Sequence, residues 1–265
     1  MRRALTILGC GSSGGVPRVA QGWGACDPSN PRNRRRRCSA LVEQGAGAKM
    51  TRVLIDTSPD LREQLLGAEV SALDAVLISH PHADHTHGID DLRPIYIATR
   101  RRVNVFLDEA TSRAMRRTFA YAFETPPGSI YAPMLQEHRL ECGQHRQIEG
   151  AGGAVDVLPF HIQHGEINAL GFRFGGLAYT PDVSAIPDKA LPFLENLAVW
   201  IIDGLRYTRH PTHFSVDEAL AWIERLRPRR AIITNLHTDL DYNELRSRLP
   251  EHVTPAYDGM RIEGF

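Results

Sequence analysis

One short segment concentrates side chains that can bind metal ions. It reads Ser-His-Pro-His-Ala-Asp-His-Thr-His-Gly and covers residues 79–88. Imidazole and carboxylate groups are the usual ligands of borderline divalent ions such as Zn, Mn, Fe or Co. On a loop that leaves a strand, His80 and His82 can face one ion while Asp84 and His85 turn to a second. The H-x-H-x-D-H spacing therefore predicts a metal site rather than a solvated turn or a chance cluster.

The elements that must position this segment are short apolar runs alternating with amphipathic stretches, which is typical of an α/β fold. Several runs are apolar at consecutive positions, as expected of strands covered on both faces. We expect strands at Leu5–Gly9, Ser39–Glu43, Val53–Asp56, Ala75–Ser79, Val103–Leu107, Val155–Phe160, Leu170–Phe174, Gly176–Tyr179, Val199–Asp203 and Ala231–Thr234. The metal-binding segment then begins at the end of one of these strands.

Helices must cover these strands, and two segments are good candidates. Glu109–Phe123 carries recurring apolar and aromatic side chains. Ser215–Leu226 begins with a serine, and Glu218 follows three residues later, which is the pattern of a capping box. Residues 124–153 lack clear periodicity and are interrupted by proline and glycine, so we expect a loop with short strands there.

The composition is that of a globular protein and restricts its partners. The chain has 265 residues, 42% hydrophobic and 23% charged, with Lys+Arg 31 against Asp+Glu 31. This zero net charge argues against binding long nucleic acid by bulk electrostatics. Neither a membrane-spanning run nor a signal peptide is recognisable, so we expect a cytoplasmic protein with no membrane partner. No linker or repeat divides the chain, which favours a single domain over residues 1–265.

The H-x-H-x-D-H segment resembles the signature of the metallo-β-lactamase fold superfamily, and further positions match along the chain. The resemblance implies a four-layer αββα sandwich. In that family an aspartate closes an earlier strand and supports the ligands, which matches Asp56. A third histidine, a metal-bridging aspartate and a last histidine follow later strands, and they match His164, Asp182 and His237.

The resemblance implies two divalent metal ions, Zn or Mn, with Fe as a further candidate. The implied ligands are, for one ion, His80, His82 and His164, for the other Asp84, His85 and His237, and between the two Asp182. Two such ions share a hydroxide and lower the pKa of its parent water toward about 7. Two alternatives remain open: His161 lies near the same strand end as His164, and Asn235 alternates to the same side of a strand as His237.

Within the superfamily, several segments resemble the PhnP-like cyclic phosphodiesterases, which are related to ribonuclease Z. These segments are the glycine-rich turn at 9–17, the arginine run before Cys38-Ser39, Asp56–Arg62 and His210–Ser215. In that branch an extra histidine is proposed to act as general acid or to hold the scissile phosphate, and it matches His213. A protonated imidazole can give an alkoxide leaving group its proton near neutral pH. The alternative is that His213 only helps to cap the following helix.

The resemblance implies a dinuclear metal-dependent phosphodiesterase acting on a small cyclic or nucleotide-like phosphodiester. Metal hydroxide would attack phosphorus, with Asp84 and His213 as catalytic residues and His213 assisting the leaving oxygen. A tRNA 3′-processing endonuclease like ribonuclease Z and a thioester hydrolase like glyoxalase II are alternatives, because they use the same metal set. A non-enzymatic ligand-binding module is a further alternative. The oligomeric state is open, and a homodimer is kept as the commonest case.

One loop departs from the cyclic phosphodiesterases, and one basic run has two interpretations. Those enzymes carry a cysteine cluster for a structural zinc after the first strand, whereas the corresponding region here holds Cys26 alone, so we expect no structural zinc. Arg32 and Arg34–Arg37 could bind a substrate phosphate, because a guanidinium offers paired donors. They could equally be solvated or pair with acids such as Asp60, and the sequence does not decide between these roles.

Overall fold

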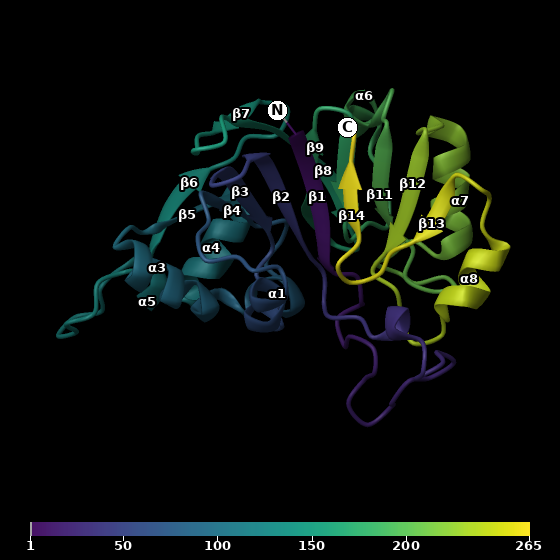
Figure 1. Ribbon diagram of the computed structural model, residues 1–265, viewed down its shortest axis with the longest axis horizontal. Helices are drawn as coiled ribbons and strands as arrows, with labels where there is room; N and C mark the ends of the chain where they lie inside the picture. Colours follow the sequence, from purple (N-terminus) through teal and green to yellow (C-terminus); the bar gives the residue numbers. More distant parts are fainter. Residues whose placement is uncertain (1) are drawn as a thin grey trace.

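The computed structural model describes residues 2–265, which form two facing sheets of seven strands each (Figure 1). The spatial order in the first sheet is β14 (Arg261–Glu263), β1 (Arg2–Gly9), β2 (Ser39–Ala46), β3 (Lys49–Ile55), β4 (Ala75–Leu77), β5 (Val103–Leu107) and β6 (Leu135–Arg139). The order in the second sheet is β13 (Val253–Pro255), β12 (Arg230–Thr234), β11 (Val199–Asp203), β10 (Leu177–Thr180), β9 (Ile167–Phe174), β8 (Val155–His164) and β7 (Arg146–Ile148).

Helices cover the outer face of each sheet (Figure 1). Those on the first sheet are α1 (Leu61–Gly67), α3 (Arg93–Thr99), α4 (Glu109–Thr118) and α5 (Ala120–Phe123). Those on the second sheet are α6 (Leu191–Leu194), α7 (Val216–Leu226) and α8 (Tyr242–Arg248). The layers therefore follow the order helix, sheet, sheet, helix, which confirms the predicted αββα sandwich.

This layering explains why the strands are apolar at consecutive positions. In β11, Val199 and Ile201 pack in the core between the two sheets, whereas Trp200 and Ile202 pack beneath the helices. Successive side chains of a strand point to opposite faces, so a strand covered on both faces needs apolar residues throughout. The ten predicted strands are all present, with ends shifted by up to a few residues.

The two predicted helices have different outcomes. Ser215 caps α7, and its side chain and that of Glu218 form both hydrogen bonds of the predicted capping box. The predicted helix Glu109–Phe123 is instead divided at Phe119, whose φ of −124° and ψ of 38° leave the helical region. The break turns α5 so that Ala122 and Phe123 are buried against the first sheet.

The remaining elements are short. Residues 124–153 contain β6 and β7 within a loop, as predicted. The terminal strands β13 and β14 and the helices α1, α3 and α8 were not predicted, because three to seven residues show little periodicity. Across residues 2–265, no helix has the length and apolar character needed to cross a membrane.

Candidate metal centre

The candidate site lies where parallel strands of both sheets end. Strands β3 to β6 run parallel in the first sheet, and β10 to β13 run parallel in the second. Their carboxyl ends are the usual location of ligand sites in parallel sheets. Asp56 follows β3 and Asn235 follows β12, and both have a left-handed φ of 62°. Such strained conformations are often found at functional sites, where they redirect the chain.

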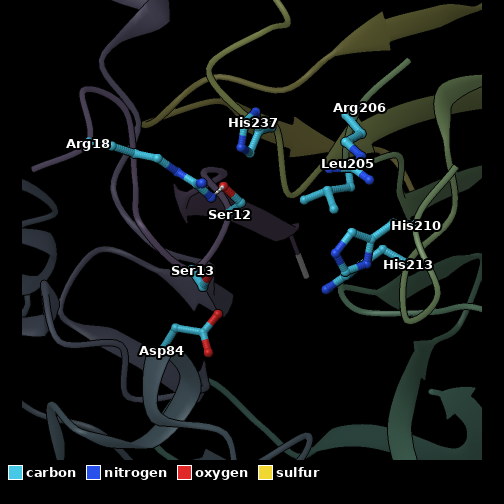
Figure 2. Close-up of a pocket in the computed structure, with 9 residues that line it drawn as sticks. All are labelled: Ser12, Ser13, Arg18, Asp84, Leu205, Arg206, His210, His213 and His237. Carbon is cyan, nitrogen blue, oxygen red and sulfur yellow. Dashed lines mark hydrogen bonds between the residues drawn. The ribbon is translucent and has the colours of Figure 1, made fainter. Parts of the chain in front are cut away.

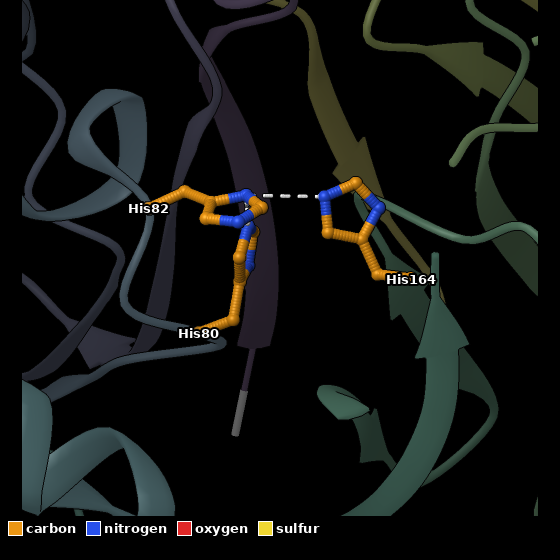
Figure 3. A group of neighbouring side chains, drawn as sticks. All are labelled: His80, His82 and His164. Carbon is orange, nitrogen blue, oxygen red and sulfur yellow. Dashed lines mark hydrogen bonds between the residues drawn. The ribbon is translucent and has the colours of Figure 1, made fainter. Parts of the chain in front are cut away.

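Three histidines converge on one point (Figure 3). Nδ1 of His82 lies 3.1 Å from Nε2 of His80 and 3.1 Å from Nε2 of His164. The outer nitrogens are held elsewhere, because Nδ1 of His80 contacts Ser79 Oγ at 3.0 Å and Nδ1 of His164 donates to the Thr212 carbonyl at 2.6 Å. Burial lowers the pKa of His80 and of His164, which favours the neutral imidazole that binds metal.

A second group contains His80, His85 and Asp182. Nε2 of His85 lies 3.2 Å from Oδ1 of Asp182 and 3.5 Å from Oδ2 of Asp84. Its Nδ1 is 2.8 Å from Oδ2 of Asp56, and that carboxylate also accepts the backbone N–H of Ser79. Burial opposes charge on His85, but the three carboxylates around it raise its pKa well above normal. This excess of negative charge suits a cation, and Asp56 takes the supporting position that the family resemblance implied.

Asp203, which sequence analysis did not single out, joins His213 to these groups. Nδ1 of His213 lies 2.8 Å from Oδ2 of Asp203 and 3.9 Å from Oδ2 of Asp182. Burial raises the pKa of Asp203 to about 7. Burial alone would lower the pKa of His213, but Asp203 and Asp182 raise it to about 9, which favours the protonated imidazole. The sequence did contain a signal for Asp203. It is an aspartate at the end of an apolar strand, as Asp56 is after β3.

The resemblance had implied that His237 shares one ion with Asp84 and His85. The structure does not bring these three side chains into one group. Within residues 2–265, the groups of three side chains close enough to share one ion omit both His237 and Asp84 and include His213. The side chain that reaches Asp182 from this segment is that of Asn235, whose Nδ2 donates to Oδ1 of Asp182 at 3.2 Å. His237 follows two residues later, where its Nδ1 lies 2.6 Å from Oδ1 of Asp239.

A cavity of about 220 Å³ opens beside these groups (Figure 2). Its lining residues are Ser12, Ser13, Arg18, Asp84, Leu205, Arg206, His210, His213 and His237. The first three come from the long loop between β1 and β2, and the last five come from loops after β11 and β12. His213 thus faces the cavity on one side and Asp203 on the other.

The arginines at 35–37 of the basic run pair with neighbouring protein oxygens, which is one of the two roles that the sequence left open. Arg37 donates twice to the Asp60 carboxylate, at 2.8 and 2.6 Å. Arg35 is buried and donates to the carbonyls of His237 and Leu240, at 3.2 and 2.6 Å. Arg36 lies 3.6 Å from the Asp258 carboxylate. These contacts fix the loop between β1 and β2 against its neighbours, and none of the run lines the cavity.

His161, the alternative to His164, points away from the candidate metal centre. Its Nε2 lies 3.6 Å from Oδ2 of Asp108, the residue that caps α4. The Asp108 carboxylate and the Cys142 thiol raise the pKa of His161 to about 9. On a β-strand the side chains at positions 161 and 164 leave by opposite faces, which explains the separation.

We expect the His161–Asp108 pair to make stability fall at alkaline pH. Because the folded-state pKa is raised, the pair stabilises fully below the unfolded value of about 6.5 and is lost as pH rises through about 9. Both groups touch solvent, so the pair should contribute at most about 1 kcal/mol to the free energy of unfolding. Urea unfolding of wild type and His161→Asn between pH 6 and 10 measures it. Identical pH dependence in the two proteins would contradict the prediction.

Comparisons with known proteins place this arrangement in a family. The family model for the "Beta-lactamase superfamily domain" matches residues 51–235, more than half of the chain. An octanoyltransferase of Porphyromonas gingivalis (strain ATCC BAA-308 / W83) is 32% identical over 257 residues, which are 96% of this chain and 50% of that protein. The chain thus spans about half the length of this relative. The anti-Pycsar protein Apyc1 of Bacillus phage 010DV004 is 27% identical over 70% of this chain and 76% of its own length.

Solved structures agree with this match. A protein described as a new diphosphatase from the PhnP family is 36% identical, with a TM-score of 0.87 over 100% of this chain and 98% of that chain. The short form of human tRNase Z shares the fold at 16% identity, with a TM-score of 0.63 over 98% of both chains. The protein therefore belongs to the β-lactamase superfamily and has the metallo-β-lactamase fold, and over its whole length it is similar to a protein of the PhnP family.

Proposed function

We propose that this hydrolase is a metal-dependent phosphodiesterase that acts on a small cyclic or nucleotide-like phosphodiester. The observation that carries the proposal is the His213–Asp203 pair, which places an imidazole oriented by a buried carboxylate on the wall of the cavity that Asp84 also lines. A phosphodiester needs a proton for its alkoxide leaving group, whereas a thiolate leaves without one. The cavity of about 220 Å³ and the zero net charge favour a small substrate over tRNA.

The side chains fit divalent metal ions. Nitrogens of His80, His82 and His164 point at one another, and Nε2 of His85 is buried with no hydrogen-bond partner among the described residues. The residues that would hold one ion are His80, His82 and His164, and those that would hold a second are His85, Asp84 and Asp182, with Asp182 between the two. Bound ions would polarise the phosphoryl group and activate water as the nucleophile.

His213 acts on the leaving group in this proposal. Asp203 holds Nδ1, so Nε2 is the ring nitrogen left to carry the transferable proton into the cavity. When water oxygen bonds to phosphorus and the ester P–O bond breaks, this proton passes to the departing oxygen, which leaves as an alcohol. Asp203 then stabilises the orientation of the ring and the tautomer that can be protonated again.

The PhnP-family diphosphatase described above favours a second candidate substrate, a diphosphate ester. The nucleophile would be the same, but the leaving group would be a phosphate oxygen, which departs without a proton. Water oxygen bonds to one phosphorus, the bond to the bridging oxygen breaks, and the bridging oxygen leaves on the second phosphoryl group.

The first experiment tests metal-dependent hydrolysis of a phosphodiester. We expect purified protein to hydrolyse bis(p-nitrophenyl) phosphate, to lose this activity in EDTA, and to recover it when Mn or Zn is added back. Metal content is measured in the same samples. Absence of turnover by metal-loaded protein would contradict the phosphodiesterase proposal and favour thioesters or a selective tRNA substrate.

A further inference from the structure

Arg18 is the arginine of the loop between β1 and β2 that lines the cavity, although it lies outside the basic run. Its backbone is fixed by two hydrogen bonds with Gly22, both 2.8 Å long. Its side chain lies against Gly14, where a Cβ would be only 2.7 Å from the Arg18 Nε. The glycine-rich turn therefore leaves room for this guanidinium beside the candidate metal centre.

The guanidinium of Arg18 has a donor without a partner, which favours an anionic ligand. Nη2 donates to Ser12 Oγ at 2.9 Å, while Nε is buried without a hydrogen-bond partner within residues 2–265. An unpaired buried donor costs free energy unless a ligand completes it. Arginines of the nearby run cannot supply the same function, because Arg35, Arg36 and Arg37 are held by carbonyl and carboxylate oxygens elsewhere.

A second guanidinium adds positive charge to the opposite wall of the cavity. Arg206 lies across from Arg18 in Figure 2, on the side of the cavity that also carries Leu205, His210 and His213. Its Nε and Nη2 donate to the carbonyls of Thr208 and Arg209, at 3.2 and 2.8 Å, which fixes its position. Arg18 and Arg206 therefore line the same cavity as Asp84 and His213.

Resting on the proposed hydrolase function, we infer that Arg18, supported by Ser12, binds a second phosphoryl group bonded directly to the one that is attacked. Arg18 lines the same cavity as Asp84 and His213, so a phosphoryl group bound by Arg18 lies next to the one that is attacked. A guanidinium matches phosphate oxygens with paired donors, which lysine cannot reproduce. The site thus selects diphosphate esters over simple phosphodiesters.

The test compares two substrates that differ by one phosphoryl group. One is the p-nitrophenyl ester of thymidine 5′-monophosphate, and the other is the diphosphate that joins thymidine 5′-oxygen and p-nitrophenol. Products are separated by chromatography, and kcat and KM are measured for metal-loaded wild type, Arg18→Gln, Arg18→Lys and Arg34→Gln. Arg34 is an exposed arginine of the same loop that does not line the cavity, so its variant is the matched control.

We expect wild type to prefer the diphosphate, and Arg18→Gln to lower the ratio of the two kcat/KM values by roughly 10- to 100-fold, mostly through KM. Arg18→Lys, which keeps the charge but not the fork of donors, should fall between them, and Arg34→Gln should keep the wild-type ratio. Wild type that prefers the simple ester, or an Arg18→Gln variant that slows both substrates equally, would overturn the inference while leaving the proposed function intact. Turnover of neither substrate by metal-loaded wild type would overturn both.

Discussion

Asp182→Asn should lose most of the bound divalent metal and lower kcat/KM for bis(p-nitrophenyl) phosphate by roughly 10³-fold or more, because metal stabilisation is worth several kcal/mol. The carboxylate is buried and touches both candidate groups, with one oxygen 3.2 Å from Nε2 of His85 and the other 3.6 Å from Nε2 of His164. Burial opposes its charge, but His85, His213 and His80 hold the pKa of Asp182 well below its usual range. The amide keeps the shape and removes that charge.

Metal content by elemental analysis and steady-state kinetics measure this effect. Asp188→Asn is the matched control, since Asp188 is exposed and lies outside the candidate metal centre. Unfolding by urea in EDTA shows whether the variant folds without metal. Full metal content in folded Asp182→Asn would contradict the placement of this carboxylate between the two ions.

The second large effect is expected for His213→Ala and depends on the leaving group. Loss of a general acid typically lowers the reaction rate by about 10²- to 10⁴-fold. We expect a loss of this size on a 2′,3′-cyclic nucleotide, whose leaving oxygen is an alkoxide. Bis(p-nitrophenyl) phosphate should be affected much less, because p-nitrophenolate leaves without a proton. The measurement is kcat for both substrates in wild type and variant.

Two controls separate the acid role of His213 from other roles. His213 also belongs to a group with His164 and Asp182 that could hold an ion, so metal content is measured in the same variant. Metal loss with equal slowing of both substrates would identify a ligand instead of an acid. His210→Ala should lower kcat less than His213→Ala does. The ring of His210 lies 5.1 Å from that of His213, but the Asp203 carboxylate contacts His213. Full activity of His213→Ala on thioesters would favour thioester hydrolysis.

Local sequence predicted the features that neighbouring residues determine. The H-x-H-x-D-H segment sets its own ligand spacing, so His80, His82 and His85 are found where the motif placed them, after β4. The capping box of α7 depends on two residues three positions apart, and it formed as predicted. Continuous apolar runs indicated strands covered on both faces, because side chains alternate between the two faces of a sheet.

The sequence by itself thus determined most of the strands and the metal-binding segment, and its family resemblance implied the layered fold, whereas tertiary structure decided which distant side chains meet at the site. His213 and Asn235 reach Asp182 because β10, β11 and β12 end side by side, and the left-handed turn at Asn235 leaves His237 outside the groups. Burial likewise fixed the arginines of the basic run on neighbouring oxygens and left Arg18 facing the cavity. Spacing along the chain sets local geometry, but contacts between segments far apart depend on strand order, register and burial.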